Sequence, residues 1–239
     1  MIAKAWLKVA ASLVEAYLRA VAKTAEIRFC LDNGVDFMPR AEIAAVSSEL
    51  LASAPLLLPF WNAHSLLLIS AYLGSAPLTL TAQQFEAVVD DSIGGQLTQL
   101  IFDRIGLSVR RLSIRSPEGR LIDMREMLEQ KPSLVMAADS HGPYRAVSTG
   151  MARLARHYAG CVRPVSLACD RAVFIFPKIR MLVPLPGATI LLALGSRLGT
   201  RGAVADTRLS LQSALLDLEA KSAGALRTSR IQLRCSKKI

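Results

Sequence analysis

A long uncharged stretch constrains the fold of this chain more than any other part of the sequence. The segment from Leu51 to Phe85 contains no aspartate, glutamate, lysine or arginine, and His64 is its only histidine. A helix that spans a membrane needs about 20 consecutive apolar residues. The stretch is broken into shorter pieces at Pro55, Pro59, Asn62, His64, Gly74 and Pro77. It therefore predicts buried elements of a globular core rather than a transmembrane segment.

Within this stretch the pattern predicts a strand, a turn, a helix and a second strand. Leu56 to Phe60 form a short apolar run typical of a buried strand, Ser65 to Leu73 are expected to be helical, and Pro77 to Leu80 to form the next strand. His64 then lies where a strand gives way to a helix, which is where open α/β sheets bind ligands. Because histidine exchanges protons near neutral pH, it is a candidate base. A buried structural histidine is the alternative.

The rest of the chain continues the alternation of strands and helices. Further helices are expected at 96–105, 149–157 and 204–221, and another is expected to end over 124–130. Further strands are expected at 107–112, 133–137, 163–168 and 188–194. Thr149 is a candidate cap for its helix. The last helix should turn one side largely inward, carrying Leu209, Leu211, Leu215, Leu216 and Leu218. We expect a single α/β domain with a mixed, mostly parallel central sheet flanked by helices.

The N-terminal 25 residues have the pattern of an amphipathic helix. Polar residues recur at steps of three or four, and apolar residues fill the remaining face: Lys4, Lys8, Ser12, Glu15, Arg19 and Lys23 against Trp6, Leu7, Leu13, Val14, Tyr17 and Leu18. Such a helix either lies on a membrane surface or docks on its own domain. The expected organisation is thus a helix over 1–25, an α/β domain over 26–222 and a basic tail over 223–239.

Charge and cysteine content narrow the classes of partner. Lys and Arg number 29 against 19 Asp and Glu, giving a net charge of +10 that would attract anionic lipids, acidic carrier proteins or nucleic acid. Aromatic residues make up only 5% and do not interleave with basic ones, so we expect no nucleic-acid partner. The four cysteines show no C-x-x-C spacing and there are no clustered histidines, so no metal site is predicted.

Short motifs follow one another in order from His64 onward. They are Phe-Trp-Asn-Ala-His-Ser at 60–65, Gly106 to Ser113, Asp139 to Arg145 with Gly150, Arg163 to Val165, and Leu182 through Gly195. Together, over roughly residues 25 to 198, they resemble the successive motifs of lysophospholipid acyltransferase-like proteins. The resemblance is greatest to a bacterial branch whose third motif is Pro-Asp-Gly-Pro-Arg-Gly-Pro.

The resemblance implies a glycerol-3-phosphate acyltransferase-like fold and an acyltransferase of phospholipid biosynthesis. Its members move a fatty acyl group from an acyl-CoA or acyl carrier protein to the hydroxyl of a lysophospholipid or other lipid, with the motif histidine, here His64, as general base. The thioester is a co-substrate and no cofactor is implied. The implied location is peripheral, on the cytoplasmic face of the bacterial inner membrane.

The usual acid partner of the motif histidine is absent from both expected places. Family members carry an aspartate five residues after the histidine, where this chain has Ile69, and the bacterial branch has Asp-Gly-Glu where this chain has Gly94-Gly95-Gln96. Asp90, Asp91 or Asp139 are the candidates to orient the ring instead. A catalytically degenerate lipid-binding protein of the same fold is therefore the alternative function, and a membrane-surface scaffold is a third.

The resemblance also nominates residues for substrate binding. Arg111 and Ser113 align with an Arg-Gly-Ser segment that can hold a phosphate, and the 141–145 loop corresponds to the third motif. With His64, Asp139 and Asp91 as catalytic candidates, the expected binding set is Asn62, Ser65, Arg111, Ser113, His141, Gly142, Pro143 and Arg145. Arg111 as a plain surface arginine and Asp139 as a structural cap are the alternatives. Gly94 and Gly95 offer backbone N–H groups to an anion or form a simple turn.

Overall fold

The fold is taken from a computed structural model, which describes residues 2–31, 55–75, 85–113, 123, 126–127, 129–130, 133–140, 143–175 and 180–236. The strand predicted at Pro77 to Leu80 lies outside these residues, as do His141 and Gly142.

Four strands form an all-parallel sheet that leads directly into the His64 segment. They are β2 (Leu57–Phe60), β3 (Phe85–Asp90), β4 (Ser108–Leu112) and β5 (Ser133–Ala137), in the order β2-β5-β3-β4. Parallel neighbours need crossover connections rather than tight turns. The carboxyl ends of all four strands, including the end of β2 beside His64, therefore lie at the same edge.

A second sheet continues the first on the other side of β2. It contains β1 (Glu26–Leu31), β9 (Thr189–Leu194) and β6 (Val165–Cys169), with β1 parallel and β6 antiparallel to β9. Leu57 N donates to Cys161 O at 2.9 Å and Arg163 N donates to Leu57 O at 2.9 Å, which ties β2 to the chain just before β6. The strands β7 (Ala172–Ile175) and β8 (Met181–Pro184) form a separate hairpin. A mostly parallel α/β domain is thus confirmed.

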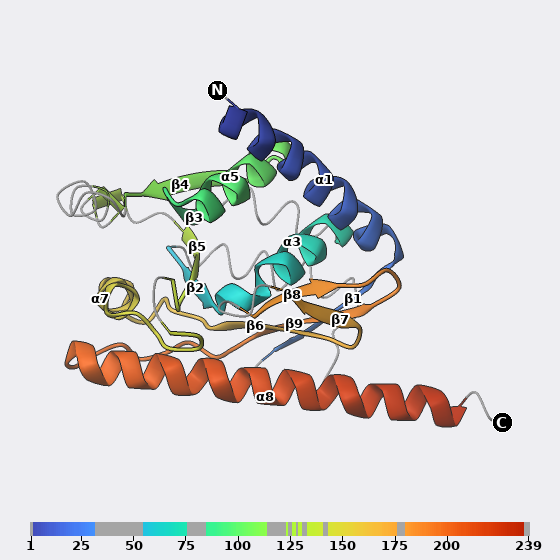
Figure 1. The fold of residues 1–239 in the computed structure, drawn as a ribbon. Helices are drawn as coiled ribbons and strands as arrows, with labels where there is room; N and C mark the ends of the chain where they lie inside the picture. The colour runs from blue at the N-terminus through green and yellow to red at the C-terminus, as the bar shows by residue number, and fades with distance from the viewer. Residues whose placement is uncertain are drawn as a thin grey trace.

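Helices cover both faces of these sheets (Figure 1). On one side α1 (Ile2–Thr24) packs across α3 (Ser65–Gly74) and α5 (Ile93–Ile105), burying apolar residues from all three. On the other side the long α8 (Val204–Ser236) runs along β6 and β9 and packs against α7 (Thr149–His157). This second side matters for function because α8 brings a carboxylate to His64.

The start of α5, the cap of α7 and the end of α8 differ from the sequence prediction, and α5 begins at Ile93 rather than Gln96. The bounds of α7 agree with the prediction, but the cap is Ser148, whose Oγ accepts a hydrogen bond from Met151 N at 3.1 Å, rather than Thr149. Helix α8 does not end at Lys221 but continues to Ser236, through most of the segment predicted to be a tail.

The inward side of α8 is also narrower than predicted. Leu211, Leu215 and Leu218 are buried, whereas Leu209 and Leu216 are exposed. An α-helix turns by about 100° per residue, so leucines at adjacent positions cannot all face the sheet.

Candidate active site around His64

His64 lies at the strand-to-helix junction predicted from the sequence. Strand β2 ends at Phe60, a short 3-10 turn follows at Asn62–His64, and α3 begins at Ser65. His64 N donates to Trp61 O at 2.8 Å, and Ser65 Oγ donates to Asn62 O at 2.7 Å. These bonds fix the turn, and the residue is only 1% exposed.

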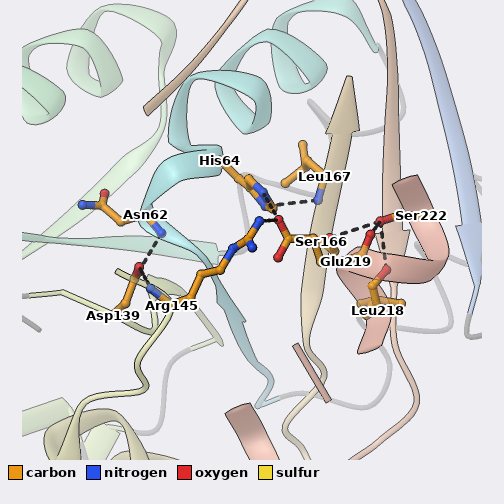
Figure 2. Close-up of polar contacts among 9 residues, drawn as sticks. All are labelled: Asn62, His64, Asp139, Arg145, Ser166, Leu167, Leu218, Glu219 and Ser222. Carbon is orange, nitrogen blue, oxygen red and sulfur yellow. Dashed lines mark hydrogen bonds and ion pairs between the residues drawn. The ribbon is translucent and has the colours of Figure 1, made fainter. Parts of the chain in front are cut away.

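Both ring nitrogens of His64 have partners (Figure 2). Leu167 N donates to Nδ1 at 3.4 Å, and Nε2 lies 3.4 Å from Glu219 Oε1. Since a backbone N–H can only donate, Nδ1 presents its lone pair and the proton of the neutral ring is on Nε2. The proton therefore faces the carboxylate of Glu219, an arrangement typical of an oriented histidine.

Leu167 N can donate to Nδ1 because the backbone N–H and C=O groups of successive residues in β6 point alternately toward β9 and away from it. Gly195 N donates to Pro164 O at 2.8 Å and Asp170 N donates to Thr189 O at 3.2 Å, so alternate residues of this strand bond to β9. The N–H of Leu167 therefore points to the edge of β6 that faces away from β9. On that side, an isolated bridge joins Leu57 of β2 to Val162, which precedes β6. The imidazole thus satisfies an edge N–H that would otherwise be buried without a partner.

Glu219 connects His64 to Arg145. Its carboxylate, 15% exposed, accepts from Arg145 Nη2 through the same oxygen that faces His64. Burial alone would raise the pKa of Glu219, but hydrogen bonds from His64 and Arg145, together with the positive charge of Arg145, outweigh burial and hold the pKa below its ordinary 4.5. Glu219 is therefore ionised at neutral pH.

Arg145 itself is held in an uncommon backbone conformation. Its φ of 58° is in the left-handed region, which costs a residue with a Cβ some energy. Its guanidinium lies over the Tyr144 ring, 4.9 Å from the centroid. The Nε atom is buried and has no hydrogen-bond partner among the described residues. Within the described part of the chain, one N–H of the arginine beside Glu219 therefore has no acceptor.

Asp139 holds the site together but does not touch the ring. Its two carboxylate oxygens accept from Asn62 N at 2.8 Å and from Arg145 N at 3.2 Å, and the residue is 6% exposed (Figure 2). It therefore links the turn that carries His64 to the turn that carries Arg145. The structural alternative for Asp139 fits this geometry, and the role of ring-orienting acid does not.

The acids after β3 have local partners of their own. Asp90 Oδ1 accepts from Ser92 N at 2.8 Å, and Asp91 contributes its backbone carbonyl to Gln96 Nε2 at 3.0 Å. The partners of the His64 ring are Leu167 and Glu219. Among the described residues, the carboxylate in contact with the His64 ring is thus Glu219, and not Asp90, Asp91 or Asp139.

The diglycine before α5 serves a local purpose. Gly95 N donates to the capping Ser92 Oγ at 3.1 Å, so this N–H is not available to an anion. A Cβ at Gly95 would overlap the Asp90 carbonyl oxygen and Oδ1, whereas one at Gly94 would meet only Ser92 Oγ, at 3.7 Å. The first helical turn packs so closely on Asp90 that only glycine fits at Gly95.

The other predicted binding residues divide into two groups. Arg111 and Ser113 belong to the β4 end of the sheet, three strands from β2 and hence about 14 Å away at ordinary strand spacing. There Arg111 Nε donates to Gln99 Oε1, and Ser113 N donates to Asp123 Oδ2 at 2.8 Å.

The second group adjoins His64 in the chain or in space. The Asn62 side chain points away from the ring (Figure 2). Ser65 Oγ lies 3.2 Å from Asn62 Oδ1. Pro143 is exposed and its carbonyl accepts from Ala146 N at 3.0 Å. Of the predicted binding residues that are described, Arg145 is the one whose side chain joins the His64 network.

Glu219 is the site residue that sequence reasoning missed. It lies four residues after the buried Leu215 and next to the buried Leu218, on the inward side of α8. An acid on the buried stripe of an amphipathic helix needs a partner. That position was the one available signal, and it could not identify which residue the partner would be.

Metal and thiol chemistry gain no support from the described residues. Among them, no group of three or more His, Cys, Asp or Glu side chains is arranged to hold a metal ion. Burial raises the pKa of both Cys30 and Cys169 to about 11, so each is a protonated thiol at neutral pH.

Comparison with protein-family models and with curated proteins finds no match to this chain.

Proposed function

We propose that this protein is an acyltransferase that moves a fatty acyl group from an acyl thioester to the hydroxyl of a lysophospholipid-like acceptor. The observation that carries the proposal is the contact of 3.4 Å between His64 Nε2 and the ionised Glu219. It supplies the acid partner that the motif comparison lacked. A glycerol-3-phosphate acyltransferase-like fold and a catalytic dyad of His64 and Glu219 are parts of this proposal.

In this mechanism His64 acts through Nδ1. The acceptor hydroxyl replaces the N–H of Leu167, which is bound at the long distance of 3.4 Å. Nδ1 takes the hydroxyl proton as the oxygen attacks the thioester carbonyl, and Glu219 stabilises the resulting imidazolium through Nε2–H. The tetrahedral intermediate then collapses, the carbon–sulfur bond breaks, and Nδ1–H returns the proton to the leaving thiolate. Proton and charge balance are restored without another reactant.

Arg145 has two roles in the proposal. Through Nη2 it fixes the carboxylate of Glu219. Its Nε–H, which has no partner among the described residues, is available to an anionic group of the acceptor or to the developing oxyanion.

A second candidate function is lipid binding without turnover. It is favoured by the same ring geometry, because His64 is 1% exposed and both of its nitrogens are engaged. A base must first lose one of these contacts before a hydroxyl can reach it. If this second function is correct, the network of His64, Glu219 and Arg145 has a structural role only, which is to hold α8 against the sheets.

The test is acyl transfer from labelled acyl-CoA or acyl carrier protein to lysolipid, measured for the wild type, His64→Ala and His157→Ala. His157 is the matched control because it is exposed at the end of α7. We expect a loss on the order of 10²- to 10⁴-fold in His64→Ala and no loss in His157→Ala. Full activity in His64→Ala would refute the mechanism. A wild type that co-purifies with intact lipid and shows no turnover would establish the second candidate.

A further inference from the structure

Helix α1 carries two apolar faces, and residues of the described part of the chain cover only one of them. Ala11, Leu18 and Val21 are buried, and Ala11 and Leu18 pack against α3 and α5. Trp6, Val9 and Leu13 project outward, with 69%, 50% and 67% of each residue exposed. Spacings of three and four residues place these three on one side of a helix. We call them the outer stripe.

The position of α1 leaves the outer stripe accessible to a broad partner. In Figure 1 the helix lies at the edge of the molecule, with α3 and α5 on one side of it. The stripe spans about 10 Å of helix at 1.5 Å per residue. It is a ridge on a convex element rather than a groove, which suits contact with a flat and deformable surface.

The charge beside the outer stripe indicates the chemistry of that surface. Over the exposed part of α1, Lys8, Arg19 and Lys23 are opposed only by Glu15, which is already bound by Arg19 and by Arg104 of α5. The whole chain has a net charge of +10. Exposed tryptophan and leucine beside lysine and arginine are typical of helices that lie in the headgroup region of an anionic bilayer.

We infer that α1 binds the surface of an anionic lipid bilayer, inserting Trp6, Val9 and Leu13 to the depth of the headgroups. None of the helices in the described part of the chain is long and apolar enough to cross a membrane. The contact is therefore made from one side, by the stripe and its basic flank together. This inference goes beyond the proposed acyl transfer and holds whether or not His64 is a base.

The two tryptophans allow a direct measurement. Trp6 is exposed, whereas Trp61 has no exposed surface. Titration with vesicles of phosphatidylglycerol and phosphatidylcholine should shift the Trp6 emission to the blue, and pure phosphatidylcholine should not. The variant Trp6→Phe should still sediment with anionic vesicles but show no shift. Absence of binding by the wild type to anionic vesicles would overturn the inference.

Matched variants separate the stripe from general surface hydrophobicity. Trp6→Ser with Leu13→Ser should weaken sedimentation with anionic vesicles at least about tenfold. Leu209→Ser, at an equally exposed leucine of α8 (66%), should leave binding unchanged. Lys8→Gln should weaken binding about fivefold, since each basic residue near such a surface contributes about 1 kcal/mol.

Two results would contradict the inference at this stage. The first is equal loss of binding in Leu209→Ser and in the stripe variant. The second is a concentration-dependent dimer in light scattering that dissociates in the stripe variant, which would make the stripe an interface between copies. Thermal unfolding followed by circular dichroism checks that the variants remain folded.

Discussion

Oε1 of Glu219 contacts both Nε2 of His64, at 3.4 Å, and the guanidinium of Arg145. The three residues come from the turn before α3, the long α8 and the turn after β5. The ion pair therefore holds a loop and a helix against the second sheet at the same point where the proposed chemistry occurs.

Replacing Glu219 should destabilise the fold. Glu219→Gln keeps the shape of the side chain but leaves Arg145 and the Nε2–H of His64 without a charged acceptor in a mostly buried position. We expect the free energy of unfolding in urea to fall by about 1–3 kcal/mol. The control is Asp217→Asn, which removes the exposed pair with Lys221 on the same helix and should cost less than about 0.5 kcal/mol. Equal effects in the two variants would contradict the buried pairing.

The stabilisation by Glu219 should depend on acid pH. His64 and Arg145 hold the folded-state pKa of Glu219 below 4.5 even though burial opposes them, so ionised Glu219 favours the folded state. That contribution is complete above the unfolded value of 4.5 and disappears as the pH falls through the folded pKa. Urea unfolding of the wild type and Glu219→Gln from about pH 6 to about pH 3 should show their difference shrinking only at the acid end. A difference that grows below pH 4.5 would show the opposite linkage.

Asp139→Asn should impair both stability and acyl transfer. An asparagine can accept through only one oxygen, and its NH₂ would face the N–H of either Asn62 or Arg145. We expect a loss of about 1–3 kcal/mol in unfolding free energy. The proposed activity should fall as well, because the turn that positions His64 loses a bond. Asp103→Asn, at an exposed position of α5, is the comparison and should change neither quantity.

The two adjacent glycines should respond in opposite ways to alanine. Gly95→Ala forces a methyl group into the Asp90 carbonyl and side chain, and we expect a loss of about 1–3 kcal/mol. Gly94→Ala meets only Ser92 Oγ at 3.7 Å and improves helix propensity, so stability should be unchanged or raised by up to about 1 kcal/mol. Thermal unfolding of the two variants measures this contrast. A stable Gly95→Ala would mean that α5 does not begin as closely against Asp90 as described.

Local sequence patterns predicted the elements around His64 well. The apolar run and its breaks gave the strand at Leu57–Phe60 and the helix beginning at Ser65, because burial and chain breaking are properties of neighbouring residues. Cap and end positions were less accurate, as Ser148 and Thr149 are both good caps and only packing selects between them. The end of α8 was misplaced because a basic sequence is compatible with helix or coil.

Contacts between distant segments could not be predicted in the same way. Family spacing and the neighbouring motifs indicate acids before α5 and after β5 as partners of His64. The observed partner comes from α8, a contact determined by how that helix lies across the second sheet. Likewise, nothing in the pattern of α1 indicated which apolar residues would be covered, since that depends on the position of α3 and α5.

The placement of Glu219 on α8 has a consequence for the order of assembly during synthesis. His64 leaves the ribosome long before Glu219, so a nascent chain that has completed β9 contains the histidine but not its acid. Ser166 and Ala168 of β6 are also covered only once α8 has been made, because their contacts are with residues of that helix. The ring contact and the cover of the second sheet therefore form in one late step, and a chain interrupted before Val204 has neither.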